Sequence, residues 1–548
     1  MTTQNLEEPL LKLEDFYDQP SGDESPASYS EFADENPERK SKCSIFRKIP
    51  FIAYIVGAMM LVILILFLAA SLLPPSEDVP PEYNFTNHSK SVMQVAEDEN
   101  FGPKGIHISL TESPSAIAIQ FSTATIGKAV VEIAEKSNPA ETKKYDGEST
   151  TYQASDMCIS NQSTHTKEFV PPGQLHTVKV TGLKVNVEYI YRAGISTGQG
   201  IRWGNYTGFR SPKPPGFIPK VGNNSKSAPL TFLALADQGI ENGTITGCPF
   251  KPGSGAGRNV TRLITALTLN QTIDSIHIVG DLSYADGNTH IWDQYVNMIQ
   301  PFASRVPTMV AVGNHEFDYA KGDGSKIDGS GMKTDKVFHP AWGGQSFHDE
   351  GGECGVPFAK RFAAPNNGNS VFWYSFEQSL MHTIILSSEH NMTKGSAQYK
   401  FLEADLAGVN RTRTPWIVVE LHRPLYNSEM YWSSDAIGIA MRDEIEQLLH
   451  VNQVDLVMSG HYHAYLRTCD GLYQEKCWNG GPQYITIGTG GAPLDCNTPL
   501  IPNHYTKKFD DKHFGVGRVS VYNASALHFE FVVLGGEVKD DFWLLRER

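Results

Sequence analysis

The sequence predicts an α/β domain with a buried sheet, preceded by an all-β sandwich and, near the N-terminus, by one transmembrane helix. The α/β prediction depends on nearly continuous apolar strands that alternate with helix-compatible stretches between residues 226 and 535. Short segments of alternating polar and apolar residues between 102 and 214 indicate the sandwich. One uninterrupted apolar run, residues 51–73, indicates the membrane helix.

The apolar run also predicts how the chain is oriented in a membrane. Its 23 residues carry no charge and can cross a hydrocarbon core of about 30 Å with some tilt. Basic residues precede the run and acidic residues follow it, which keeps residues 1–49 in the cytosol and sends 74–548 to the lumen or the outside. We expect a single-pass type II protein with an uncleaved signal anchor and a stalk over 74–101. A soluble hydrolase with a cleaved leader is the alternative.

Glycosylation acceptors and cysteines agree with this orientation. Asn-X-Ser/Thr can be modified only on the luminal side, and every such site follows the apolar run. The eleven sites are Asn84, Asn87, Asn161, Asn205, Asn223, Asn242, Asn259, Asn270, Asn391, Asn410 and Asn523. Six of the seven cysteines also follow the run, so up to three disulfides are expected there, with the pairing left open. No CxxC spacing occurs, which argues against a zinc ribbon or a redox motif.

The cytosolic segment is strongly acidic. Residues 1–38 contain eleven acidic residues and one Lys, a net charge of −10 of the chain's −15, and their polar composition is typical of disorder. This acidity argues against nucleic acid as a partner. The stretches "EEPLL" (7–11) and "YSEF" (29–32) resemble dileucine and tyrosine sorting signals. An endolysosomal or vacuolar membrane is therefore one expected address, beside the plasma membrane.

The predicted sandwich is similar to a fibronectin type III module. Strands are expected at 115–121, 177–183 and 188–194, bounded by Gly, Pro and Asn. In "VTGLKVNVEYIYRAG" we expect Tyr189 to tie its loop back to the backbone. The proline-rich stretch 211–220 then serves as a semi-rigid linker to the α/β domain, and residues 536–548 are expected to form a C-terminal tail.

Five strands of the α/β domain end in residues that can bind metal ions. These strands are expected at 230–237, 276–281, 307–315, 415–422 and 454–461, with helices at 258–272 and 443–450. Their ends carry Asp237, Asp281 with Tyr284, Asn314 with His315, His422, and His461 with His463. Singly, each could be a helix cap or a satisfied polar group. Five successive strand ends with oxygen and imidazole donors instead predict a site for iron, zinc or manganese at this edge of the sheet.

The motifs "DQG", "GDLSY", "GNHE", "LH" and "GHYH" at these strand ends resemble those of the purple acid phosphatases. These are binuclear metallophosphoesterases that bind Fe(III) through a tyrosine. The resemblance extends over nearly all of residues 102–535 and looks like the longer, plant-type branch with a fibronectin-like N-terminal domain. It implies a catalytic domain of two mixed sheets flanked by helices. Gly239 replaces the histidine of the DxH motif of other metallophosphoesterases, and Tyr284 is the tyrosine that they lack.

The resemblance implies a role for each residue at the strand ends. The ferric ion would be bound by Asp237, Asp281, Tyr284 and His463. A divalent ion, which could be Zn, Mn or Fe(II), would be bound by Asn314, His422 and His461, with Asp281 bridging both ions. The substrate would contact Asn314, His315 and His422.

The chemistry implied by the resemblance is attack of a metal-activated hydroxide on phosphorus, without a covalent enzyme intermediate. His315 is the candidate proton donor to the leaving group, and orienting a bound water is its alternative role. Some plant members carry two adjacent histidines where this chain has Tyr431 and Trp432, so protonation depends more on His315 here. His390 and Arg423 are further candidates for substrate contact, although a structural role explains each as well.

The resemblance leaves several functions to compare. The first is an acid phosphatase that cleaves phosphate monoesters of small molecules or phosphoproteins outside the cytosol. A phosphodiesterase or nucleotide pyrophosphatase on the same scaffold is the alternative, because the metal clamp is shared and the pocket rim decides between substrates. A binding module with an inactive phosphatase domain predicts the loss of at least one ligand, yet all seven ligand positions are filled. The oligomeric state stays open, a homodimer included.

Overall fold

The computed structural model describes residues 102–157, 169–218, 228–240, 255–317, 327–333, 353–428, 432–477, 480–495 and 503–547. These residues all belong to one compact unit, Val95–Arg548. The expected transmembrane helix at 51–73, the cytosolic segment 1–49 and the stalk 74–101 lie outside the described residues. Within the described ranges, no helix is both long and apolar enough to cross a membrane.

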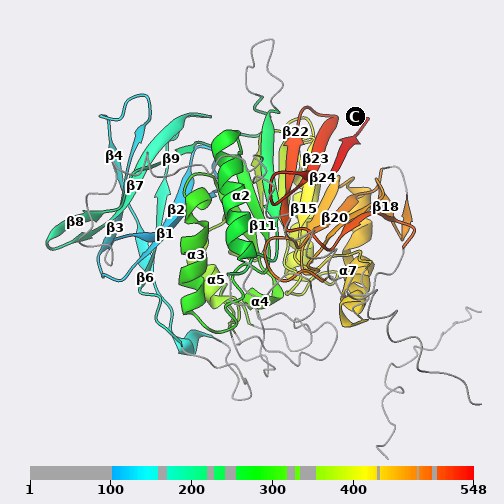
Figure 1. Cartoon of the computed structure of the whole chain (residues 1–548), viewed down its shortest axis with the longest axis horizontal. Coiled ribbons are helices and arrows are strands. Elements are labelled where there is room, and N and C mark those ends of the chain that lie inside the picture. The colour runs from blue at the N-terminus through cyan, green and yellow to red at the C-terminus, as the bar shows by residue number, and fades with distance from the viewer. Residues whose placement is uncertain are drawn as a thin grey trace, which may run out of the picture. The chain divides into compact units, whose positions relative to one another are not determined.

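The N-terminal part is a sandwich of two antiparallel sheets, as the alternating pattern predicts (Figure 1). One sheet has the order β1-β2-β6-β5, and the other has the order β4-β3-β7-β8 with β9 paired to β7. The strands are β1 Lys104–Leu110, β2 Ile117–Thr123, β3 Lys128–Glu135, β4 Lys143–Asp146, β5 Glu148–Thr150, β6 Gln174–Val180, β7 Glu188–Thr197, β8 Gly200–Trp203 and β9 Thr207–Arg210, with a short 3-10 helix at Ala154–Asp156. Inward-facing residues such as Ile119 and Val131 form its core. The Tyr189 hydroxyl accepts a hydrogen bond from the Lys184 N–H at 2.9 Å, which confirms the predicted tie between this tyrosine and its loop.

The second part of the chain forms two mixed sheets, which confirms the predicted α/β architecture. The six-stranded sheet has the order β12-β11-β10-β22-β23-β24, and the seven-stranded sheet has the order β13-β14-β15-β16-β20-β17-β21. Parallel pairs join β10, β11 and β12 in one sheet and β14, β15, β16 and β20 in the other. Antiparallel strands complete both sheets.

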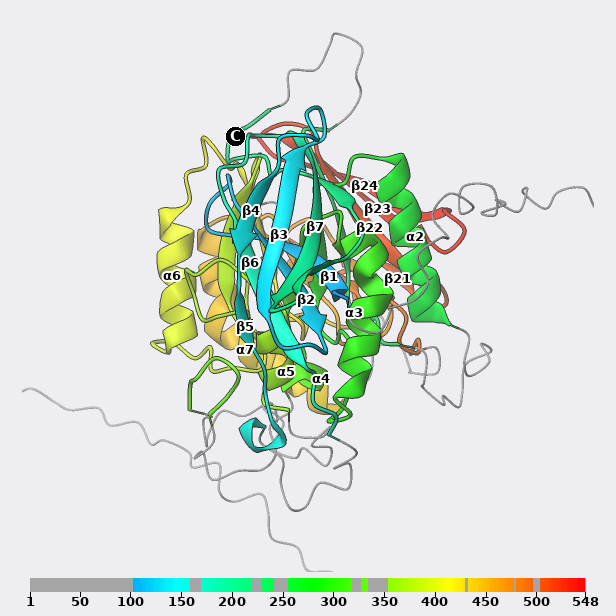
Figure 2. The same cartoon turned by 90° about the vertical axis from the view of Figure 1, so that its left-hand side faces the viewer.

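The bounds of the strands in this domain are β10 Leu230–Leu235, β11 Ser275–Val279, β12 Thr308–Ala311, β13 Tyr374–Gln378, β14 Met381–Ile385, β15 Trp416–Glu420, β16 Leu456–Ser459, β17 Tyr465–Thr468, β18 Leu472–Tyr473, β19 Lys476–Cys477, β20 Gln483–Ile487, β21 Thr506–Asp510, β22 Gly515–Val521, β23 Ala526–Val533 and β24 Val538–Leu545. The helices are α2 Ala256–Asn270, α3 His290–Ala303, α4 Asn314–Phe317, α5 Val356–Arg361, α6 Ala397–Gly408 and α7 Trp432–Val451. Figure 2 shows α2 and α3 on one side of the sheets and α6 on the other.

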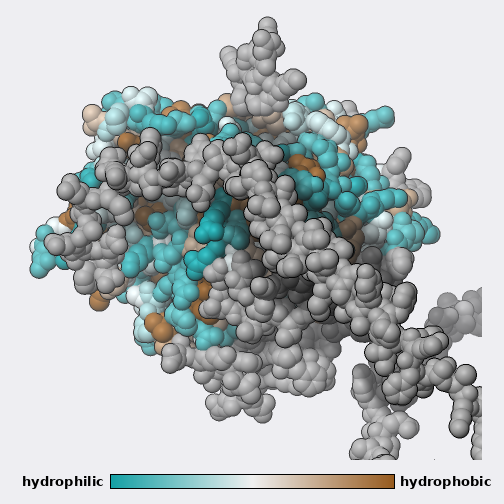
Figure 3. All heavy atoms as spheres, in the orientation of Figure 1, coloured by the Kyte–Doolittle hydropathy of each residue, from teal (hydrophilic) through white to brown (hydrophobic). Residues whose placement is uncertain are grey.

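Successive side chains of each central strand serve two different layers of the core. In β15, Trp416 and Val418 pack between the two sheets, whereas Ile417 and Val419 face the helices. Strands buried on both faces need apolar residues at nearly every position, which is the pattern that the sequence shows. Hydrophilic residues dominate the described surface in the view of Figure 3, and apolar residues are scattered on it.

The sandwich packs directly on the α/β domain through α3. The Tyr191 hydroxyl donates to the Ser304 carbonyl at 2.8 Å, and Gln300 Oε1 accepts from the Ile106 N–H at 2.9 Å. The predicted linker is also anchored, because the buried Lys213 pairs with Asp274 at 2.7 Å. Charge burial of this kind requires a partner, and each of these two groups has one. The linker therefore holds the two domains together rather than serving only as a spacer.

The structure corrects one predicted boundary and tests part of the cysteine expectation. Residues 538–545 do not belong to a tail, because β24 pairs along its length with β23 and forms the edge of the six-stranded sheet. This strand was missed because it is half exposed and carries charged residues, as edge strands do. Cys469 and Cys477 form a disulfide, and Cys354 is disulfide-bonded as well.

Candidate metal centre

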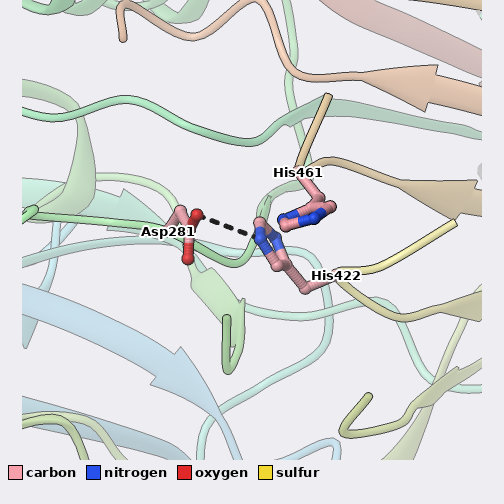
Figure 4. A group of neighbouring side chains, drawn as sticks. All are labelled: Asp281, His422 and His461. Atoms are coloured by element: carbon pink, nitrogen blue, oxygen red, sulfur yellow. Dashed lines mark ion pairs between the residues drawn. The ribbon is translucent and has the colours of Figure 1, made fainter. Parts of the chain in front are cut away.

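The residues predicted for the site lie where strands of the two sheets end. Asp237 follows β10 and Asp281 follows β11 in one sheet, whereas His422 follows β15 and His461 follows β16 in the other. Asn314 begins the short helix α4 directly after β12. Because parallel strands end at the same edge of a sheet, these side chains converge from both sheets. Figure 4 shows three of them together.

One cluster joins a carboxylate, a phenol and an imidazole. The Tyr284 hydroxyl donates to Asp237 Oδ1 at 3.1 Å and lies 2.9 Å from His463 Nε2. His463 Nε2 also lies 3.4 Å from Asp237 Oδ1. The structure therefore brings together three of the four residues predicted for the ferric ion.

A second cluster contains the remaining ligand candidates. His422 Nε2 lies 3.0 Å from Asp281 Oδ2 and 3.2 Å from Asn314 Oδ1. Asn314 Oδ1 also lies 2.9 Å from His461 Nδ1. The ligand atoms of Asp281, His422 and His461 all lie within 4.8 Å of one another (Figure 4). All four residues predicted to meet at the divalent position thus lie around one point.

Backbone carbonyls orient the two imidazoles at the ends of this arrangement. His422 Nδ1 lies 3.0 Å from the Val279 carbonyl, and His463 Nδ1 lies 2.6 Å from the Pro493 carbonyl. A carbonyl accepts only, so each Nδ1 carries a proton, and Nε2 is the nitrogen whose lone pair becomes available to a metal ion once its own proton is lost. This is the tautomer that a metal ligand requires.

The backbone around the ligands is unusual in two ways. Asp237, Asp281, Tyr284 and His461 have φ angles of 58, 50, 52 and 71°, in the left-handed region that residues with side chains rarely adopt. A Cβ atom on Gly313 would lie 2.2 Å from Asp281 Oδ1, so only glycine fits there. Strain of this kind persists where the surrounding structure enforces it, and it gathers at functional sites.

The electrostatics of both clusters favour bound cations. Burial raises the pKa of the Tyr284 phenol well above its ordinary value, and the charges of Asp237 and Asp281 raise it further, so a phenolate here requires a cation beside it. Burial lowers the pKa of His422 and of His463, but Asp281 and Asp237 outweigh it and raise both pKa values to about 9. Burial and the Arg423 guanidinium lower the pKa of His461 well below its ordinary value. The surroundings of His422 and His463 therefore stabilise positive charge, whereas those of His461 keep its imidazole neutral, the form that binds a metal ion.

His315 lies beside the clusters and has an acidic partner that sequence reasoning missed. Its Nδ1 lies 2.8 Å from Asp286 Oδ1, its ring packs on Tyr284 with the ring centroids 4.2 Å apart, and its side chain is 18% exposed. Its Nε2 lies 3.9 Å from Asp281 Oδ2. Asp286 thus holds the ring through Nδ1, and Nε2 faces the ligand candidate Asp281, as a proton donor at this site requires. Asp286 lies two residues after Tyr284, the last residue of "GDLSY", so the signal was present in the sequence.

Glu316 is a second residue that the sequence reasoning missed. Its fully buried carboxylate accepts hydrogen bonds from the N–H groups of Asp281, Leu282 and Gly313 at 2.8, 2.8 and 2.9 Å. Burial and the charge of Asp281 raise the pKa of Glu316 to about 8. It ties the turn after β11 to the turn after β12 and so fixes Asp281 relative to Asn314. The "GNHE" motif contains it, but only the fold shows what it binds.

Two weaker candidates have structural partners. His390 contacts Ser387 Oγ at 2.7 Å and Asp328 Oδ2 at 3.0 Å among buried aromatic rings, which supports its structural role. Arg423 pairs with the buried Glu389 at 2.7 Å, and its NH1 lies 3.1 Å from His461 Nε2. Trp432 begins α7, its side chain is outside the described set, and Tyr431 is not described at all.

Comparison with known proteins assigns the family. Three family models match in order: the purple acid phosphatase N-terminal domain over residues 103–211, the calcineurin-like phosphoesterase over 230–465, and the iron/zinc purple acid phosphatase-like C-terminal region over 481–541. Purple acid phosphatase 22 of Arabidopsis thaliana is 30% identical over 434 residues, which are 78% of this chain and 81% of that protein. The chain belongs to the purple acid phosphatase family. A purple acid phosphatase from yellow lupin (Lupinus luteus) seeds has the same fold, with a TM-score of 0.69 at 26% identity over 82% of this chain and 75% of that one.

Other relatives differ in what their names say. A nucleotide pyrophosphatase/phosphodiesterase of barley (Hordeum vulgare) is 31% identical over 363 residues, 63% of this chain and 89% of that protein. Four Arabidopsis thaliana relatives, 28 to 32% identical, carry the words "probable inactive purple acid phosphatase" in their names. This chain spans only 58 to 66% of the length of those four. Membership in the purple acid phosphatases therefore fixes the fold and the kind of centre more firmly than the substrate.

The residues present fit the binuclear centre of purple acid phosphatases. One cluster offers carboxylate and phenol oxygens with one imidazole, a set suited to a hard trivalent ion. The other offers carboxylate and amide oxygens with two imidazoles, a set that divalent zinc, manganese or iron accepts. Both clusters have outer partners that orient their imidazoles.

Proposed function

We propose that this protein is an acid phosphatase that hydrolyses phosphate monoesters at a centre of Fe(III) and a divalent ion, which could be Zn, Mn or Fe(II). One observation carries the proposal: all seven ligand candidates are present, and their donor atoms meet in two clusters, of which one contains the bridging candidate Asp281. In the order of the chain, these candidates are Asp237, Asp281, Tyr284, Asn314, His422, His461 and His463.

The protein's own groups have distinct roles in the proposed reaction. Two bound cations would neutralise phosphate charge and lower the pKa of coordinated water. Asn314 and His422 would contact the phosphate as well as the divalent ion, and the ester would then lie beside His315. His315 Nε2 gives a proton to the leaving alkoxide, while Asp286 stabilises the protonated ring through Nδ1. Asp286 therefore orients the His315 ring and stabilises its protonated form, and it does not contact the substrate.

Two features of the relatives bear on this proposal. The "probable inactive" names raise the possibility of an inert domain, but inactivity predicts a missing ligand, and none is missing here. The barley relative favours the second candidate function, phosphodiester or nucleotide pyrophosphate hydrolysis. Both candidates use the same ligands, so substrates must separate them. We would compare a phosphate monoester, a bis-ester and ATP on the full chain purified in detergent, and a preference for the last two would overturn the monoester assignment.

The spectrum of the iron-loaded chain tests the centre itself. A tyrosinate bound to Fe(III) gives a visible charge-transfer band, which Tyr284→Phe should abolish. Tyr295→Phe is the control, because Tyr295 is also a tyrosine of the catalytic domain but donates its hydroxyl hydrogen bond to Gln238 at 2.9 Å instead of to a ligand candidate. A band that survives in Tyr284→Phe, or that is absent from iron-loaded wild type, would contradict the ferric assignment.

We also propose that the catalytic domain is luminal or extracellular, on a type II anchor at residues 51–73, with an endolysosomal or vacuolar membrane as one address. The proposal is supported by the basic residues before the apolar run and by the eleven acceptor sites after it. Asn205, Asn270, Asn410 and Asn523 are exposed and open to modification. Glycosidase treatment of the cellular protein should lower its mass, and a catalytic domain digested by protease added to the cytosolic side of intact vesicles would overturn this orientation.

A further inference from the structure

Two ionisable side chains face each other in the layer between the two sheets. His277 of β11 and Glu420 of β15 are fully buried, with His277 Nδ1 at 2.7 Å from Glu420 Oε1. The Phe232 ring stacks on the imidazole with the ring centroids 4.4 Å apart. Glu420 Oε2 has no hydrogen-bond partner in the described part of the chain. Buried ion pairs often contribute little net stability, and apolar residues of similar size can replace them. Stability alone therefore does not explain this pair.

A chain of hydrogen bonds fixes the direction in which His277 points. Gln378 Nε2 donates to the Asp274 carbonyl at 3.1 Å, which leaves Gln378 Oε1 to accept from Ser275 Oγ at 2.9 Å. Because the Ser275 proton is used in that bond, Ser275 Oγ accepts from His277 Nε2 at 3.0 Å. The opposite nitrogen, Nδ1, is then directed at Glu420. The imidazole is held at both nitrogens and cannot turn without breaking a buried hydrogen bond.

The pair lies directly beneath the metal centre. Glu420 precedes His422 by two residues, and His277 precedes Asp281 by four. In a strand, residues two apart share a face, so Glu420 lies below His422 by roughly 7 Å. Val279 lies between His277 and Asp281, and its carbonyl accepts a hydrogen bond from His422 Nδ1. Three polar contacts therefore connect β11 with β15 in succession, and the last is the contact between Asp281 and His422.

These strands belong to different sheets, so no backbone ladder fixes their relative position. Apolar contacts between the sheets are not directional and tolerate small shifts, whereas a hydrogen bond of 2.7 Å does not. We propose that His277 and Glu420 are positioning residues: their contact sets β11 against β15 so that Asp281 and His422 reach the same divalent ion. This inference rests on the proposed metal-dependent function.

The experiment separates positioning from stability. The double variant His277→Leu/Glu420→Leu replaces the pair with apolar side chains, and Glu420→Gln keeps a hydrogen-bonding partner for His277 Nδ1 without the charge. The control is His382→Leu/Asp405→Leu, a buried histidine and a partly buried aspartate with the same 2.7 Å contact, which joins β14 to α6 and touches no ligand candidate within the described residues. Each full-length chain is loaded with Fe(III) and Zn²⁺, and the Zn²⁺ dissociation constant is measured with a chromophoric chelator, alongside thermal unfolding.

We expect the His277→Leu/Glu420→Leu chain to unfold near the wild-type temperature but to bind Zn²⁺ roughly tenfold more weakly or worse, as losses of outer ligand partners do. Glu420→Gln should restore Zn²⁺ binding to within about threefold of wild type, and the control pair should leave it unchanged. Zn²⁺ affinity within twofold of wild type in the double variant would overturn the inference.

Two further outcomes keep the test decisive. If the double variant does not fold, Ser275→Ala decides, because it removes the acceptor of His277 Nε2 with a minimal change of volume. It should weaken Zn²⁺ binding severalfold, and unchanged binding would overturn the inference. A wild-type chain that binds neither metal would instead overturn the proposed function, and the inference with it.

Discussion

The N-terminal sandwich and the metal-binding edge of the α/β domain bury very different residues. The hydrophobic core of the sandwich consists of Ile, Val, Ala, Leu and aromatic side chains, beside a few buried polar groups such as His107 and His176. Among the described residues of the sandwich, only Asn186 combines a side chain with a positive φ. At the metal-binding edge, Asp237, Asp281, Glu316 and His422 are all buried, and several backbone positions are left-handed. The sandwich therefore buries mainly the apolar residues that stabilise a fold, whereas the metal-binding edge gathers buried charges and strained backbone at a few positions.

This difference indicates that the sandwich serves stability and that the metal-binding edge serves function. Buried like charges and left-handed aspartates cost free energy, and they persist only where the fold over-determines them. In many enzymes such a site is less stable than a variant that has lost its function. If that holds here, changes at the edge should affect catalysis and leave stability intact, and changes in the sandwich should do the reverse.

Asp281→Asn should give the largest effect and sharpen the comparison most. The amide keeps an oxygen to accept from the His315 N–H at 3.0 Å but removes the charge that both clusters use. We expect phosphatase activity to fall roughly 10³-fold or more, since several kcal/mol of charge stabilisation are lost. The unfolding free energy is measured in excess chelator as well, because Asp281 attracts His422 and repels Glu316, and the substitution removes both interactions. Activity within tenfold of wild type would show that Asp281 is not a ligand, and Asp405→Asn serves as the control.

Ile119→Ala tests the opposite side of the comparison. Ile119 is fully buried in the sandwich core, so its truncation leaves a cavity. We expect the free energy of unfolding in urea to fall by about 3 kcal/mol. The turnover number measured well below the unfolding temperature should not change. A parallel loss of turnover would break the comparison, because it would mean that the sandwich core supports the active site through α3.

The same difference explains how much could be predicted from the sequence. Strands such as β10 and β15 are detectable because both of their faces are buried and their residues are apolar almost throughout. The ligand candidates were detectable because each follows such a strand, at the edge where α/β sheets bind ligands. Tyr189 was detectable because the corner motif of the sandwich is local in sequence.

The remainder depends on contacts between distant residues. Glu316 shows only as an acidic residue in a motif until β11 and β12 are placed side by side. His277 and Glu420 are 143 residues apart, and nothing local distinguishes them from polar residues on an exposed strand face. The edge strand β24 lacks an apolar run because only one residue of its eight is buried. Pairing across sheets, rather than composition, gives these residues their roles.

The pH dependence of stability at His382, a buried histidine away from the ligand candidates, extends the comparison to a second charged contact. Burial alone would lower the pKa of His382, but Asp405 at 2.7 Å and the charge of Glu377 raise it to about 9. A folded-state pKa above the unfolded value of about 6.5 stabilises the protein fully below pH 6.5, and this stabilisation is lost as the pH rises towards 9. We therefore expect His382→Asn to lower the unfolding free energy by on the order of 2 kcal/mol more at pH 6 than at pH 9.5.

Urea unfolding of wild type and His382→Asn at the two pH values measures this difference. Equal losses at pH 6 and pH 9.5 would mean that His382 is not protonated in the folded chain. Turnover at pH 6 should be the same in both proteins, because neither His382 nor Asp405 contacts a ligand candidate within the described residues. A polar pair outside the site would then contribute to stability, unlike the charges at the metal-binding edge.

The smallest expected effect is at Tyr189, where a single polar atom is changed in the apolar region. Tyr189→Phe removes the hydroxyl that accepts from the Lys184 N–H and leaves the ring packed against Phe209. We expect a loss of about 1 kcal/mol in unfolding free energy, the typical net value of one hydrogen bond. Tyr145→Phe is the control, because its exposed hydroxyl bond to the Thr181 carbonyl can be replaced by water. A larger loss in Tyr145→Phe would show that the sandwich depends on its surface polar contacts more than on the hydrogen bond of Tyr189. The sandwich and the metal-binding edge would then differ only in how their apolar side chains pack.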